Sequence, residues 1–144
     1  MVQWLKSDRL AHPQRIYVVD DDSSLSGSAR FLLATLKLGS RTFKSGQDFL
    51  DQVNGLAPGV ILLDLRMPGM DGFAVQEALK RLGIDWPVVL MTGEADMPVM
   101  ARTVRRGAVE LILKPFSDEK LLAALCKGFG RLADNSRGLP AVRA

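Results

Sequence analysis

The stretch that decides the fold is residues 60–72, VILLDLRMPGMDG. The four consecutive apolar residues 60–63 are typical of a short strand buried on both faces of a parallel sheet, and Asp64 stands where that strand ends. Proline and glycine residues then predict a loop before the next helix. In open α/β sheets, ligands and chemistry gather at the carboxyl ends of the strands. Asp64 is therefore a candidate nucleophile or metal ligand; the simpler alternative is a carboxylate that caps a turn or a helix.

Short strand-like runs alternate with amphipathic helical patterns along the rest of the chain. The strand-like runs are residues 15–19, 41–43, 60–63, 88–91 and 109–113. The helical patterns are residues 23–38, 45–53, 72–82, 98–106 and 117–132. Because strands and helices alternate five times through short connections, the sequence predicts an α/β fold, a doubly wound five-stranded parallel sheet with helices on both faces.

The composition is that of one globular domain of 144 residues, long enough to fold without a disulfide or a structural metal. The single cysteine, Cys126, lies in an apolar helical pattern and is expected to be a packed core thiol. The net charge is +3, but apart from Arg102, Arg105 and Arg106 the basic residues are scattered, and we expect no direct binding of nucleic acid. The apolar runs are too short to span a bilayer, so we expect a soluble, cytoplasmic protein.

Three adjacent acids, Asp20, Asp21 and Asp22, follow the first expected strand. Three neighbouring carboxylates repel one another, so positive charge should lie near them. Asp22 is placed to cap the helix that begins near Ser23. Asp20 and Asp21 remain at the carboxyl end of a buried strand and suit a hard cation such as Mg²⁺. The equal alternative is a pair of solvated loop acids.

Polar residues also end the fourth and fifth expected strands, where Thr92 and Lys114 stand. The carboxyl ends of parallel strands share one edge of the sheet, so we expect both residues to lie near Asp20, Asp21 and Asp64. Such a set can carry phosphoryl transfer: the acids hold Mg²⁺, Asp64 attacks phosphorus, and the hydroxyl and the ammonium each engage a phosphoryl oxygen. Taken singly, Thr92 could cap its own loop, and Lys114 could pair with a surface acid.

Together these motifs resemble the response-regulator receiver domain of the CheY-like family. The residues that carry the resemblance are 18–22 (VVDDD), 64–72 (DLRMPGMDG), 89–93 (VLMTG) and 113–116 (LKPF). The segments RMPGM and MTGEAD look closest to receivers of the nitrogen-fixation-regulator (FixJ) type. The resemblance implies the strand order 2-1-3-4-5 and a receiver domain over residues 15–131. A leader, 1–14, and a flexible tail, 132–144, with no output domain, would flank it.

The resemblance also implies roles for the acids. Asp64 would be the phospho-acceptor and would receive its phosphoryl group from a sensor histidine kinase or a histidine phosphotransfer protein. Asp21 would ligate Mg²⁺, or Mn²⁺, directly, and Asp20 would act largely through water. The backbone carbonyl of Arg66 would supply a further ligand. Such a protein is a signalling domain rather than an enzyme, because it catalyses only its own phosphorylation and dephosphorylation.

In the family, phosphorylation draws the hydroxyl at the Thr92 position inward and turns an aromatic residue on the fifth strand. The surface formed by residues 98–106, 109–113 and 117–132 then changes its preference for a downstream protein partner. The resemblance further implies a phosphoryl-binding role for Lys114 and a cis peptide to Pro115. Leu111 stands at the switch position where Tyr or Phe is usual, so we expect a weaker or altered coupling.

Two further features concern lifetime and assembly. Arg66 and Glu94 follow Asp64 and Thr92 by two residues each, and they could pair above the phosphoryl site and restrict the attacking water. The equal alternative is two solvated loop charges. The surface of the helix at 98–106 and the fifth strand is also a candidate homodimer contact.

The sequence favours a stand-alone receiver, and three other interpretations remain. One is a receiver fragment of a longer transcriptional regulator. A second is a receiver-fold interaction module that works without phosphorylation, for which Leu111 leaves some room. A third is a metal-dependent phosphatase, but Arg66 stands where a second acid would be needed to protonate a leaving group.

Overall fold

The computed structural model describes residues 15–21, 27–36, 38–93 and 97–136. The strands are β1 (Arg15–Val19), β2 (Gly39–Phe43), β3 (Val60–Asp64), β4 (Val88–Thr92) and β5 (Glu110–Leu113). The helices are α2 (Gly27–Thr35), α3 (Gly46–Gln52), α4 (Gly72–Arg81), α5 (Met97–Arg105) and α6 (Asp118–Ser136), with a short 3₁₀ turn, η1 (Val53–Gly55), after α3. The predicted alternation of strands and helices is confirmed.

The five strands form one sheet in which every neighbouring pair is parallel, in the order β2-β1-β3-β4-β5. This order confirms the predicted doubly wound fold. The direction of winding changes between β1 and β3, which is where ligands bind in folds of this class. In the register of these strands Val19 lies opposite Leu63. The residues that follow them, Asp20 and Asp64, therefore meet at the carboxyl edge.

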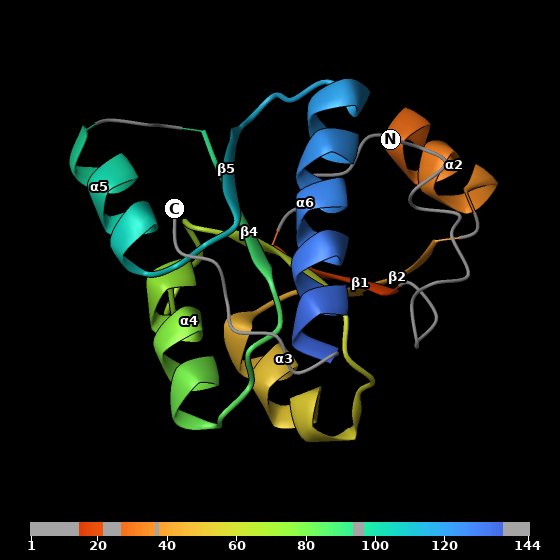
Figure 1. The fold of residues 1–144 in the computed structure, drawn as a ribbon. Helices are drawn as coiled ribbons and strands as arrows, with labels where there is room; N and C mark the ends of the chain where they lie inside the picture. Colours follow the sequence, from red (N-terminus) through yellow and green to blue (C-terminus); the bar gives the residue numbers. More distant parts are fainter. Residues whose placement is uncertain (1–14, 22–26, 37, 94–96, 137–144) are drawn as a thin grey trace.

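Helices cover both faces of the sheet (Figure 1). On one face α2 and α6 pack a largely aliphatic core, in which Leu33, Leu125 and Phe129 are almost fully buried. Cys126 lies partly buried against this core, and burial raises the pKa of its thiol, as expected of a packed cysteine. On the other face α3 and α4 pack a core that contains Tyr17, Phe43 and Phe49, with Trp86 against its edge. We call these four residues the aromatic cluster.

Two helices have ends that differ from the prediction by more than one residue. The helix predicted over residues 23–38 ends at Thr35, because the backbone N–H of Leu38 turns back to the carbonyl of Leu33 at 2.9 Å and closes the helix. Its expected start, with the predicted cap at Asp22, lies outside the described residues. The last helix runs past its expected end near Leu132 to Ser136. The Asn135 side chain donates to the carbonyl of Asp85 at 3.0 Å, which anchors the extra turn.

The loop after β3 turns directly into α4. The Asp71 carboxylate caps this helix by accepting from the backbone N–H of Ala74 at 2.8 Å. Gly72, the first residue of α4, donates its N–H to the carbonyl of Leu65 at 3.0 Å. The start of α4 is thereby held against the end of β3. Among the described residues, no helix is long and apolar enough to cross a membrane.

Candidate functional site

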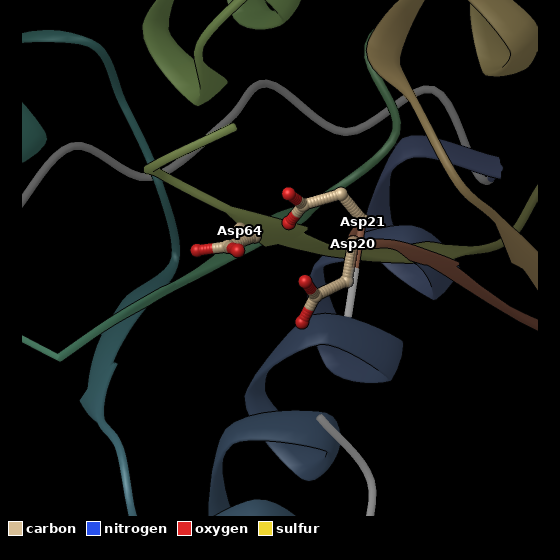
Figure 2. Close-up of side chains that lie close together, drawn as sticks. All are labelled: Asp20, Asp21 and Asp64. Atoms are coloured by element: carbon tan, nitrogen blue, oxygen red, sulfur yellow. The ribbon is translucent and has the colours of Figure 1, made fainter. Parts of the chain in front are cut away.

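Three carboxylates meet at the carboxyl edge of the sheet, between β1 and β3. Asp20 and Asp21 follow β1, and Asp64 ends β3. One carboxylate oxygen from each lies within 4.8 Å of the others, and Figure 2 shows the three side chains gathered there. Asp20 and Asp64 are buried, with 1% and 6% of their surface exposed, whereas Asp21 is open to solvent. Two buried acids thus share a site with one that solvent can reach.

Lys114 connects the two buried acids. Its Nζ lies 2.9 Å from Oδ2 of Asp20 and 3.4 Å from Oδ2 of Asp64. The backbone N–H of Lys114 donates to the carbonyl of Thr92 at 2.8 Å, which keeps the lysine beside the end of β4. The peptide from Lys114 to Pro115 is cis, as the resemblance implied. Within the described part of the chain, one ammonium therefore pairs with two acids of this group of three.

The electrostatics of the site follow from this imbalance. Burial, together with the hydrogen bond and the charge of Asp20, raises the pKa of Asp64 from 3.8 to about 6. The backbone N–H of Arg66, 3.2 Å from Oδ1 of Asp64, and the charge of Lys114 oppose that rise. Burial lowers the pKa of Lys114, but its contacts with Asp20 and Asp64 outweigh burial and hold that pKa above its usual value. Ionised Asp64 therefore needs more positive charge than Lys114 supplies.

The donor set fits a divalent cation. Carboxylate oxygens are the ligands that Mg²⁺ prefers, and three of them lie close enough here to share one ion. A cation would also add positive charge beside Asp64, whose ionised form is disfavoured. The backbone of Arg66 lies against Asp64 through its N–H, while the Arg66 side chain is exposed. The predicted ligands Asp20, Asp21 and Asp64 are thus brought together.

The other predicted residues lie on neighbouring strands. Thr92 ends β4, is fully buried, and lies opposite Leu113 of β5. The backbone N–H of Leu65 donates to the carbonyl of Met91 at 2.8 Å, so the chain that leaves Asp64 runs beside the end of β4. Leu111 of β5 is half-buried against the core on the side of the aromatic cluster. Glu94 lies outside the described residues, so its pairing with Arg66 stays a prediction.

A contact between α4 and α5 escaped the sequence analysis. The guanidinium of Arg102 lies over the ring of Phe73, 4.1 Å from its centroid, and that of Arg106 lies 5.8 Å from the same centroid. Arg106 also pairs with Glu77. Both pairs of residues are four apart in the sequence, and this spacing, which places each pair on one side of its helix, was the available signal. Arg102 and Arg106, considered above only as surface charges, therefore contact the helix that follows Asp64.

A cavity of about 570 Å³ lies beside this contact. Its lining comes mainly from the loop after Asp64, with Arg102 of α5: Leu65, Arg66, Met67, Pro68, Gly69, Asp71, Phe73 and Arg102. The loop after Asp64, Phe73 of α4 and Arg102 of α5 therefore line one cavity together.

Comparisons with known proteins agree with this geometry. Residues 16–126 match the response regulator receiver domain. The transcriptional regulatory protein FixJ of Bradyrhizobium diazoefficiens is 38% identical over 110 residues, which are 76% of this chain and 54% of FixJ. The tetrathionate response regulatory protein TtrR of Salmonella typhimurium is 40% identical over 110 residues, again 76% of this chain and 53% of TtrR. The crystal structure of full-length FixJ from B. japonicum is similar, with a TM-score of 0.76 at 34% identity, over 86% of this chain and 61% of that one.

The chain belongs to the response-regulator receiver domain family. Receiver domains are signalling domains of two-component systems, in which they work with histidine kinases. The chain spans about half the length of the curated relatives that it matches.

Proposed function

We propose that the protein accepts a phosphoryl group on Asp64 from a phosphohistidine donor, in a reaction that depends on Mg²⁺ or Mn²⁺. The donor would be a sensor histidine kinase or a histidine phosphotransfer protein. The observation that carries the proposal is the arrangement of buried Asp20 and Asp64, bridged by Lys114, with exposed Asp21 within reach of the same point.

The chemistry begins with a carboxylate oxygen of Asp64, which attacks the phosphorus of the donor. An O–P bond forms, the P–N bond to the donor imidazole breaks, and the electron pair of that bond leaves with the imidazole, which takes up a proton. A bound divalent cation would neutralise charge on the phosphoryl oxygens. Residues that position charge account for most of the catalysis in such transfers.

The chain's own residues have distinct proposed roles. Asp20, Asp21 and the carbonyl of Arg66 hold the cation, with Asp21 nearest to solvent. Lys114, already 3.4 Å from Asp64, turns its ammonium toward the new phosphoryl group and compensates one of its charges. Thr92 Oγ engages a second phosphoryl oxygen from the neighbouring strand.

The phosphorylated state would act on a partner protein through the surface of α5, β5 and α6. Leu111 on β5 is aliphatic and half-buried, so the aromatic switch of the family is missing at this position. We expect phosphorylation of Asp64 still to change the surface of α5, β5 and α6, but with altered coupling between the two. A homodimer formed through α5 and β5, a lifetime set by Arg66 and Glu94, and a cytoplasmic location stay predictions.

A longer regulator is the second candidate function, and one observation favours it. FixJ, a transcriptional regulatory protein, and TtrR are each about twice as long as the segment that they share with this chain. In that case the receiver would control a further domain rather than a separate partner. The stand-alone receiver stays a prediction beside it.

Intact-mass measurement tests the proposed acceptor chemistry. The protein is incubated with acetyl phosphate and Mg²⁺, in parallel with Asp64→Asn and with a chelated sample. We expect the parent to gain the mass of one phosphoryl group and the other two samples to gain none. A parent that gains no phosphoryl group from acetyl phosphate or from a phosphohistidine donor would favour the phosphorylation-independent module.

A further inference from the structure

The contact between α4 and α5 is built from four side chains, Phe73, Glu77, Arg102 and Arg106, which we call the clasp. Arg102 stacks on the Phe73 ring at 4.1 Å, and Arg106 reaches the same ring at 5.8 Å while it pairs with Glu77. A guanidinium within about 6 Å of a ring centroid is attracted by the negative face of the ring. Each member of the clasp therefore touches a residue of the other helix.

The clasp is tied to Asp64 by close backbone packing. A Cβ on Gly72 would lie 2.9 Å from the carbonyl oxygen of Asp64 and 2.9 Å from the Cα of Leu65. Only a residue without a side chain allows α4 to begin this close to the end of β3. Phe73 comes next and is 4% exposed, so it is fixed by its surroundings. We therefore expect a shift of the backbone at Asp64 to reach Phe73.

The loop after Asp64 and Arg102 of α5 also line one cavity. The cavity of about 570 Å³ opens between this loop and Arg102. Arg66, Pro68 and Gly69 on the loop side of the cavity are exposed. Phe73 lines the same cavity, and its ring contacts Arg102.

We infer that the clasp transmits the state of Asp64 to α5, with Phe73 as its positioning residue. The inference rests on the proposed function, because it takes phosphorylation of Asp64 as the event that is transmitted. β5 carries Leu111 and so offers no aromatic ring at the switch position. Phe73 provides an aromatic ring on a different route, through α4. Of its two cationic partners, Arg102 belongs to α5 and Arg106 to the turn that follows α5. A cation–π contact depends on where the cation lies over the ring, so a small shift of the ring changes how firmly α5 is held.

The test is hydrogen exchange of the α5 amides, measured with and without phosphorylation by acetyl phosphate and Mg²⁺. Intact mass first establishes that each sample carries the phosphoryl group. Phe73→Leu removes the π face but keeps an apolar side chain, whereas Phe73→Tyr keeps the face and serves as the conservative rescue. Arg102→Gln removes the nearer cation. Arg81→Gln, at an exposed position on α4 outside the clasp, is the matched control.

The measured quantity is the protection of the α5 amides in the phosphorylated protein divided by their protection in the unphosphorylated protein. A variant that loosens α5 equally in both states does not change this ratio. We expect Phe73→Leu and Arg102→Gln to reduce this ratio by about two- to fivefold, the effect of losing one exposed cation–π contact. Phe73→Tyr and Arg81→Gln should keep the parent ratio.

Three outcomes would overturn the inference: a phosphorylated parent whose α5 protection does not change, a Phe73→Leu variant with the full parent ratio, or a Phe73→Tyr variant that fails as Phe73→Leu does. Failure of the proposed function looks different, because the parent would then gain no phosphoryl mass.

Discussion

The aromatic cluster and the carboxyl edge of the sheet both include residues in or next to β1. They differ in how well their polar and charged groups are paired. In the aromatic cluster the ring centroids of Tyr17 lie 5.7 to 6.3 Å from those of Phe43, Phe49 and Trp86. The Tyr17 hydroxyl donates to the carbonyl of Ala57 at 2.6 Å. Three residues further along β1, Asp20 enters a group of three carboxylates that faces one lysine.

The contrast teaches where this domain is stable and where it is prepared for chemistry. Packed rings with a hydrogen-bonded hydroxyl stabilise the fold. The raised pKa of buried Asp64 means that its ionised form is disfavoured there, and functional sites commonly show such perturbed groups. Each prediction below changes one side of this contrast.

The largest expected effect comes from the aromatic cluster. Phe49→Ala removes a fully buried ring and should lower the free energy of unfolding by about 3–5 kcal/mol, because the cavity cannot be refilled completely. Urea denaturation measures the change. Phe31→Ala, at a position 75% exposed on α2, is the matched control and should have little effect. Equal losses in the two variants would contradict the assigned core.

The second largest effect on stability is expected at Gly72, where α4 begins beside the end of β3. In Gly72→Ala the new Cβ would meet backbone atoms of Asp64 and Leu65 at 2.9 Å, so overpacking should cost about 1–3 kcal/mol. Gly55→Ala, where nothing lies within 4 Å of the added Cβ, is the control and should be close to neutral. Thermal unfolding of the two variants decides whether α4 is pressed against β3.

The dependence of stability on pH that comes from Asp64 should have the opposite sign to that of an acid whose ionised form stabilises the fold. The pKa of Asp64 is raised from 3.8 to about 6 in the folded protein, so between these pH values the folded state binds more protons than the unfolded state. Without metal, stability should therefore fall as the pH rises from about 4 to about 6. Asp64→Asn should remove this fall and stabilise the protein at pH 7 by on the order of 1–2 kcal/mol.

Denaturation across this pH range, with Mg²⁺ removed by a chelator, measures the effect. Asp85→Asn, an exposed loop acid, is the matched control and should keep the parent slope. Added Mg²⁺ should stabilise the parent more than Asp64→Asn. If the stability of the parent rises from pH 4 to pH 6 in step with that of Asp64→Asn, ionised Asp64 does not destabilise the folded state and the prediction is wrong.

The smallest effect is expected at Leu111. A Leu111→Tyr variant restores the aromatic residue usual in the family and should raise the coupling between Asp64 and the α5–β5 surface by about fivefold, the low end of common coupling factors. The readout is the change in backbone amide shifts of β5 and α5 on phosphorylation, with Leu113→Tyr at an exposed position as the control. An unchanged shift in Leu111→Tyr would remove Leu111 as the cause of weak coupling.

The contrast between the two regions also explains what the sequence could predict. The apolar runs and their spacing predict the strands, and parallel strands must end at one edge, so the meeting of Asp20 and Asp64 was predictable. That Lys114 binds Asp20 rather than a surface acid depends on the distance across the two strands that lie between β1 and β5, which only the structure provides. Local sequence patterns predict contacts between residues of two separate helices less well.

The clasp and the end of α6 are such cases. Arg102 and Phe73 lie in different helices, and their contact depends on how α4 and α5 are placed relative to each other (Figure 1). The local sequence around Asn135 is polar and predicts a flexible tail. The helix nevertheless extends to this residue, because the Asn135 side chain donates to the carbonyl of Asp85 in a distant loop. Tertiary contacts of this kind override local propensity.

The measurement that tests the central claim most directly is the location of the phosphoryl group. Borohydride reduces an aspartyl phosphate to homoserine, and tandem mass spectrometry of the digested protein then identifies the converted residue. The account predicts homoserine at position 64, with Asp20 and Asp21 unchanged. Homoserine at position 20 or 21, or a phosphorylated protein with Asp64 intact, would contradict it.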